Sequence, residues 1–184
     1  MNRLGIYSGT FDPVHQGHIG FGLKAAQVCG LDEVVFLPET QPREKNDVSA
    51  IAERIEQLQR VAQPYPQLAV LDLKTDQFTI EKTLPDLLDR FADAELTLLV
   101  GSDVVRTFLY RWTNLDILFG QMSLAIGLRQ GDTAEDIRKV LNQLERQHNL
   151  TITYTIMLSP YADVTSSQFR SLRNIAPDLS RSAP

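Results

Sequence analysis

The turn GTFDPVHQGH, which spans residues 9–18, is the most informative part of this sequence. A short apolar run at residues 3–8 precedes the turn and predicts a buried strand, and helical periodicity follows it over residues 18–29. Gly30 then stands where a left-handed helix cap is expected. Because Gly9 carries no Cβ, a ligand or another backbone segment can approach the turn closely. The pattern therefore predicts a strand–turn–helix unit with a binding function at its turn.

Short apolar runs and helical segments alternate along the rest of the chain. We expect further strands at residues 33–37, 68–73, 96–101, 122–128 and 152–157. The connections between them have helical period, which is typical of right-handed crossovers in a parallel sheet covered on both faces. The sequence therefore predicts one α/β domain over residues 1–184, with a doubly wound parallel sheet and a frayed tail at residues 176–184.

Polar residues mark where these helices are expected to begin. Ser49 is placed to cap the helix after the second strand, and a start near Thr83 suits the next one. A short helix should run from Ser102, and Asp132 is expected to cap an amphipathic helix that ends near residue 147. A last short helix is expected near Ser166. Ligands of such a sheet bind at the carboxyl ends of its strands.

Composition and charge exclude several classes of protein. Lys and Arg total 18 against 23 Asp and Glu, a net charge of -5, which argues against a general binder of nucleic acid or anionic membranes. Cys29 is the only cysteine, so neither an internal disulfide nor a multi-cysteine zinc site can form. The apolar run at residues 96–100 is too short to span a bilayer, and no signal-type apolar core follows the N-terminus. We expect a soluble, cytoplasmic protein.

Two histidines lie three residues apart where the first helix begins. His15 and His18 can therefore share one face with the unpaired backbone N–H groups of the helix start, which favours a phosphate site. A zinc site is an alternative, although it would need carboxylates or the one remaining histidine, His148, as further ligands. A capped turn without function is the third interpretation. The stretch matches neither the dinucleotide glycine fingerprint nor the Walker loop.

The turn resembles the (H/T)xGH motif of the nucleotidyltransferase superfamily, and most of all its form in bacterial nicotinate-nucleotide adenylyltransferases. The likeness continues through three further motifs along nearly the whole chain. They are Phe78-Thr79 ahead of Thr83-Leu84, Gly101-Ser102-Asp103 with Trp112, and Val164-Thr165-Ser166-Ser167-Gln168-Phe169-Arg170. The resemblance implies a Rossmann-like nucleotidyltransferase fold. It also implies that a mononucleotide phosphate attacks the α-phosphorus of ATP and releases pyrophosphate, with Mg²⁺ arriving on the ATP.

The resemblance assigns most of the site to ATP. The residues that it implies for ATP binding are Gly9, Thr10, Phe11, His15, His18, Gly101, Asp103, Ser166, Ser167 and Arg170. The implied catalytic residues are His15, His18, Arg170 and Lys45. His18 would meet the charge that develops at the α-phosphoryl group. Asp103 would accept the ribose hydroxyls, although it is equally expected as a helix N-cap.

Several positions depart from the family pattern or have a plain alternative. Lys45 is expected to close over the triphosphate from the loop at residues 38–47, but Glu44 places an acidic group beside this anion site. Arg54 coincides with a family arginine, yet an exposed helix face explains it equally well. Arg129-Gln130-Gly131 stands where the family often has RPG. The chain also ends 14 residues after Arg170, where family members continue, so a divergent nucleotide-binding paralogue with little turnover stays open.

Thr79 and Trp112 are the residues implied for the pyridine nucleotide. Trp112 would stack on the pyridine ring, although a lone tryptophan is as often a core residue. If Thr79 and nearby backbone N–H groups bind the ring substituent, a carboxylate should be preferred to a carboxamide, whose NH₂ would meet donors. The resemblance implies nicotinate mononucleotide as the substrate, and a threonine or backbone donor by itself suits an amide as well as a carboxylate. Nicotinamide mononucleotide, 4′-phosphopantetheine and a binding module without turnover are the alternatives, and assembly into a homo-oligomer stays open.

Overall fold

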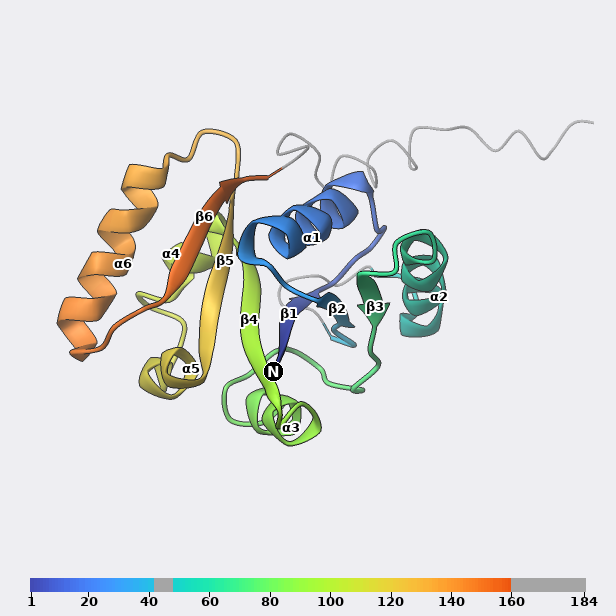
Figure 1. Ribbon diagram of the computed structural model, residues 1–184, viewed down its shortest axis with the longest axis horizontal. Coiled ribbons are helices and arrows are strands. Elements are labelled where there is room, and N and C mark those ends of the chain that lie inside the picture. The colour runs from blue at the N-terminus through green and yellow to red at the C-terminus, as the bar shows by residue number, and fades with distance from the viewer. Residues whose placement is uncertain (42–47, 160–184) are drawn as a thin grey trace, which may run out of the picture.

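The computed structural model describes residues 1–41 and 48–159, and these ranges form a six-stranded parallel sheet flanked by helices (Figure 1). The strands are β1 (Asn2–Gly9), β2 (Glu33–Pro38), β3 (Leu68–Val70), β4 (Ala94–Gly101), β5 (Met122–Leu128) and β6 (Tyr154–Leu158). Their spatial order is β3-β2-β1-β4-β5-β6, and every neighbouring pair is parallel. The order reverses between β1 and β4, as in a doubly wound Rossmann-like sheet. The predicted fold class is confirmed.

Helices cover both faces of this sheet. They are α1 (Gln16–Cys29), α2 (Ile51–Ala62), α3 (Thr83–Arg90), α4 (Ser102–Thr107), α5 (Leu115–Gln121) and α6 (Ala134–His148). The helices α1 and α2 bury apolar side chains against one face, and α3 to α6 bury theirs against the other. Because both faces are covered, consecutive apolar residues of β4 pack on opposite faces: Leu98 belongs to the larger core and Leu99 to the smaller one.

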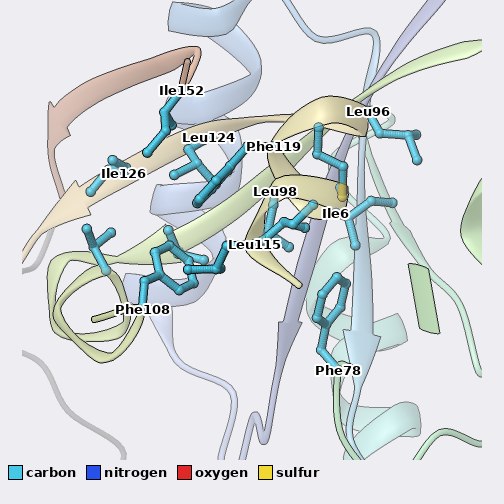
Figure 2. Packing of buried hydrophobic residues seen from close by; sticks show 14 of the residues in the cluster. Ile6, Phe78, Leu96, Leu98, Phe108, Leu115, Phe119, Leu124, Ile126 and Ile152 are labelled. Carbon is cyan, nitrogen blue, oxygen red and sulfur yellow. The ribbon is translucent and has the colours of Figure 1, made fainter. Parts of the chain in front are cut away.

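The larger core holds the ends of β4 and β5 in place. Figure 2 shows how Phe108, Leu115 and Phe119 from the α4–α5 region gather over the sheet residues Leu124 and Ile126. The rings of Phe108 and Phe119 meet edge to face with centroids 5.7 Å apart. Close packing of this kind makes the sheet edge above it a rigid support for a site.

Three element boundaries bear on the site. The helix α1 begins at Gln16, earlier than predicted, because His15 is its N-cap. The helix α3 begins at Thr83, as predicted. The strand β3 ends at residue 70, whereas the sequence predicted residue 73. Here the backbone N–H of Lys74 donates to the Asp72 carboxylate at 2.9 Å, and a φ of 53° at Lys74 turns the chain off the sheet.

Two predicted helix caps are wrong. The Thr133 hydroxyl caps α6 by accepting the backbone N–H of Asp136 at 3.1 Å, so Asp132 is not the cap. The N-cap position of α2 is Ala50, which makes no side-chain capping bond, so Ser49 does not cap that helix. The helix predicted near residue 166 and the tail at residues 176–184 lie outside the described residues. Within the described ranges no helix is long and apolar enough to cross a membrane.

Candidate active site

The carboxyl ends of the central strands and the start of α1 surround a small pocket. Its lining residues are Tyr7, His15, Gly17, His18, Phe21, Gly101, Gly127, Arg129 and Ser159. The pocket lies where the strand order reverses, because the connections after β1 and β4 leave toward opposite faces and open the sheet edge between them. Three of the predicted site residues, His15, His18 and Gly101, line this pocket.

The two histidines hold each other in place at the start of α1. His15 Nδ1 accepts the backbone N–H of Gly17 at 3.1 Å, and His18 Nδ1 accepts the backbone N–H of His15 at 3.2 Å. The pair forms a capping box, and the two rings stack with centroids 3.7 Å apart. Because Nδ1 accepts in both rings, the proton of each neutral ring is on Nε2, and each ring is a donor there.

This capping changes the predicted role of the helix start. The sequence predicted unpaired backbone N–H groups beside the histidines, but those of His15 and Gly17 donate to the imidazoles. Burial, followed by the nearby charge of Arg129, lowers the pKa of His15 to about 4. His15 is therefore a neutral hydrogen-bond donor at pH 7. An anion bound here would accept hydrogen bonds from the imidazole side chains and not from the backbone N–H groups of His15 and Gly17.

The buried ring of Phe11 packs against aromatic side chains on both sides of the turn. Its ring is 2% exposed and packs edge to face on the His18 ring at 5.1 Å and on the Tyr7 ring at 5.2 Å. A Cβ added at Gly9 would lie 3.1 Å from the Phe11 ring. The space that Gly9 leaves is therefore filled by Phe11, whereas the sequence predicted a ligand or a backbone segment there.

Asp103 and Arg129 form an ion pair across the ends of β4 and β5. The Nε atom of Arg129 lies 3.3 Å from Oδ1 of Asp103, and the side chains are 42% and 60% exposed. A Cβ at Gly101 would collide with both groups, so glycine makes room for the pair. Gly101 is itself the N-cap of α4, so the alternative role of Asp103 as an N-cap is wrong. Its half-exposed carboxylate remains able to accept hydrogen bonds from a sugar.

A polar cluster holds Arg129 from behind. The Ser102 hydroxyl accepts the backbone N–H of Arg129 at 2.9 Å and donates to the Asp132 carboxylate at 2.6 Å. Arg106 pairs with the same carboxylate at 2.5 Å. The hydrogen bond from Ser102, followed by that from Arg106, holds the pKa of Asp132 below its usual range. Arg129 was not predicted as a pocket residue, although its place directly after β5 was a usable signal.

Arg54 is buried beneath the turn, so its interpretation as an exposed helix residue is wrong. The side chain is 1% exposed, and its guanidinium donates to the carbonyls of Thr10 at 2.7 Å and Glu39 at 2.9 Å. Asp12, only 5% exposed, provides a nearby negative charge. The signal was available in the sequence: Arg54 stands four residues before Leu58, on the apolar face of α2.

Thr79 and Trp112, the residues predicted for the pyridine nucleotide, are not among the residues that line the pocket, and Trp112 lies beside Phe78, the residue before Thr79. The ring centroids of Phe78 and Trp112 are 6.2 Å apart. Trp112 is half-buried, packs edge to face on Phe108 at 5.1 Å, and donates from Nε1 to the Thr107 hydroxyl at 2.9 Å. One side of the indole is thus anchored in the core while part of it stays exposed. Both interpretations of Trp112 therefore remain compatible with its position.

The backbone donors beside this group are already engaged. The N–H of Phe78 donates to the Glu39 carboxylate at 3.1 Å, and the N–H of Thr79 donates to the Thr83 hydroxyl at 3.0 Å. The structure therefore does not support the argument that these N–H groups select a carboxylate substituent. Glu39, which was not predicted as a site residue, accepts the N–H of Phe78 instead.

Four predicted site residues, Lys45, Ser166, Ser167 and Arg170, lie outside the described residues. Among residues 1–41 and 48–159, no group of three or more His, Cys, Asp or Glu side chains can hold a metal ion. The zinc interpretation of His15 and His18 therefore has no ligand set in that part of the chain.

The comparison with known proteins gives a consistent family. A family model described as cytidylyltransferase-like matches residues 6–172. A probable nicotinate-nucleotide adenylyltransferase of Clostridium perfringens is 30% identical over 165 residues, which cover 86% of this chain and 81% of the relative. A protein of the same name from Neisseria meningitidis is 30% identical over 181 residues, which cover 96% and 88%.

Solved structures agree with the fold. Plasmodium falciparum nicotinic acid mononucleotide adenylyltransferase complexed with NaAD superposes with a TM-score of 0.74 at 16% identity, covering 93% of this chain and 83% of that one. A putative nicotinate-nucleotide adenylyltransferase from Vibrio parahaemolyticus gives a TM-score of 0.57 at 16% identity, covering 78% and 82%. At these identities the two structures establish a shared architecture.

Proposed function

Because the chain belongs to the cytidylyltransferase-like family of nucleotidyltransferases, we propose that it transfers the adenylyl group of ATP to nicotinate mononucleotide. The products are nicotinate adenine dinucleotide and pyrophosphate. The observation that carries the proposal is the pair of mutually capped histidines, His15 and His18, which share a pocket with Arg129 where the strand order reverses. The names of the curated relatives support the choice of the nicotinate substrate.

In the proposed reaction the protein contributes mainly by positioning the two substrates and by stabilising negative charge. An oxygen of the mononucleotide phosphate bonds to the α-phosphorus of ATP, and the bond to the bridging oxygen breaks, so that pyrophosphate leaves with the electron pair. The attacking phosphate is already ionised at pH 7 and needs no general base. His15 and His18 would donate from Nε2 to the phosphoryl oxygens, and Arg129 would add a positive charge in the same pocket.

The other predicted residues complete this scheme as proposals. Asp103 would accept the ribose hydroxyls of ATP from its half-exposed position beside Arg129. Trp112 and Thr79 would bind the pyridine end of the mononucleotide. The triphosphate would be bound by Lys45 from the loop at residues 38–47 and by Ser166, Ser167 and Arg170 from the C-terminal part of the chain.

We treat Mg²⁺ as part of the ATP substrate. The polar side chains that line the pocket are two imidazoles, a guanidinium and the hydroxyls of Tyr7 and Ser159, and the carboxylate of Asp103 beside it is paired with Arg129. Mg²⁺ prefers oxygen ligands and keeps much of its water shell, so phosphate oxygens and water suit it better than these side chains. We further propose a cytoplasmic location, since the reaction consumes ATP, and a homo-oligomer remains a prediction.

A substrate panel tests the proposal. The purified chain is given Mg²⁺ and ATP with nicotinate mononucleotide, nicotinamide mononucleotide or 4′-phosphopantetheine, and pyrophosphate release is followed for each. We expect the highest kcat/KM with nicotinate mononucleotide, and loss of turnover in excess chelator. A higher kcat/KM with either other acceptor would assign that substrate instead. ATP binding without pyrophosphate release from any of them would identify a binding module.

A further inference from the structure

Glu39, at the end of β2, joins the turn to the segment that carries Phe78. Its Oε1 atom accepts the Ser8 hydroxyl and the backbone N–H of Phe78, each at 3.1 Å. Its own backbone N–H donates to the Gly9 carbonyl at 3.0 Å, and its carbonyl accepts Arg54 at 2.9 Å. This half-buried residue therefore contacts the end of β1, the buried guanidinium and the start of the proposed pyridine pocket.

The carboxylate of Glu39 bonds a residue further along the chain than the backbone N–H groups of residues 40 and 41 do. Residues 40 and 41 donate their backbone N–H groups to the carbonyls of Thr75 and Asp76, each at 3.0 Å. These two bonds hold the segment at residues 75–76, together with the bonds from the Thr40 hydroxyl to the Asp76 carboxylate at 2.7 Å and from Gln77 Nε2 to the carbonyl of residue 41 at 2.9 Å. The backbone N–H of Phe78, which comes two residues later, is held by the Glu39 carboxylate. A hydrogen bond to an ionised acceptor is stronger than one between neutral groups.

We propose that Glu39 is a positioning residue for the mononucleotide, holding Phe78 and the adjoining pyridine pocket in register with the turn. The inference rests on the proposed function, because it takes Thr79 and Trp112 as the pyridine pocket. The Phe78 ring is 4% exposed and lies next to Trp112, so a shift of the Phe78 backbone moves a wall of that pocket. The two histidines depend on the capping box of α1 and not on this bond.

The split between the two substrates tests this role. Steady-state kinetics, with each substrate varied in turn, are measured for the wild type, Glu39→Met and Glu39→Gln. We expect Glu39→Met to raise KM for nicotinate mononucleotide about tenfold and to leave KM for ATP within about twofold. Glu39→Gln keeps an acceptor oxygen and should restore most of the affinity. Glu53→Met, at an exposed position on α2, is the matched control and should behave as the wild type.

Several results would overturn the role of Glu39. Equal rises in both KM values, an unchanged KM for the mononucleotide, or a Glu39→Gln enzyme as impaired as Glu39→Met would each do so. Thermal unfolding reports whether Glu39→Met folds. If it does not fold, Glu39→Ala provides the same test. Turnover by the wild type reports on the proposed function and the variants report on Glu39, so the two failures are distinguishable. A wild type inactive on this mononucleotide would remove both.

Discussion

His15 and His18 each use one ring nitrogen, Nδ1, to accept a backbone N–H group, and in the proposed reaction each donates to phosphate from the other, Nε2. Their Nδ1 atoms accept backbone N–H groups at the start of α1, so the proton of each neutral ring is on Nε2. Hydrogen bonds from such donors strengthen as negative charge grows on the accepting oxygens. In the proposed reaction they would therefore stabilise the transition state of phosphoryl attack more than the bound substrate, which is what a rate increase requires.

Removal of the His18 imidazole should reduce turnover more than the loss of any other side chain in the turn. We expect His18→Ala to lower kcat by about a hundredfold, or roughly 3 kcal/mol of transition-state stabilisation, as for other charge-stabilising donors. The measurement is kcat at saturating levels of both substrates, with urea unfolding to verify that the variant folds. His148→Ala, at the exposed end of α6, is the control and should keep its kcat. Near-normal turnover by folded His18→Ala would refute the assignment.

Single residues also show which parts of the site were predictable. His15 and His18 were found because both lie in one short turn, and Asp103 because it follows a recognisable strand. The contacts of Glu39 and Arg129 were missed because their partners are distant in the sequence: Phe78, 39 residues away, precedes α3, and Asp103, 26 residues away, lies in α4. Those contacts depend on the spatial order of the strands, which local sequence patterns do not contain.

Among elements, the link between the turn and α2 depends on one buried side chain. The start of α2 has no side-chain cap, and Arg54 bonds the Ser49 carbonyl at 3.0 Å just before it. The same guanidinium bonds the Thr10 carbonyl at 2.7 Å, which fixes the helix to the turn. A buried cation that satisfies several carbonyls is costly to remove, because its partners are left without a donor.

Arg54→Met should therefore destabilise the fold. We expect a free energy of unfolding lower by about 3 kcal/mol in urea titrations, and Arg54→Lys should recover only part of it, since lysine lacks the planar fork. Arg60→Met on the same helix removes an exposed ion pair with Glu56 and should cost less than about 0.5 kcal/mol. Equal losses for the two methionine variants would show that Arg54 does not anchor α2.

At the scale of the whole molecule, the sheet topology decides where the chemistry lies. Strands buried on both faces contain consecutive apolar residues, such as those at positions 98–100 of β4, and for this reason their positions could be predicted. The early end of β3 could not, because it depends on a local bond between Asp72 and Lys74 and on a positive φ. The strand order brings the ends of β1, β4 and β5 to one edge and assembles the histidines with Arg129 there.

The fate of each phosphate of ATP tests the central proposal most directly. The purified chain is incubated with Mg²⁺, nicotinate mononucleotide and ATP labelled either at the α-phosphate or at the γ-phosphate, and the products are separated by chromatography. The proposal predicts the α-label in nicotinate adenine dinucleotide and the γ-label in pyrophosphate, since attack occurs at the α-phosphorus. A γ-label transferred to the mononucleotide would show a different reaction. Both labels remaining in bound, unchanged ATP would show binding without transfer, and either result would contradict the proposal.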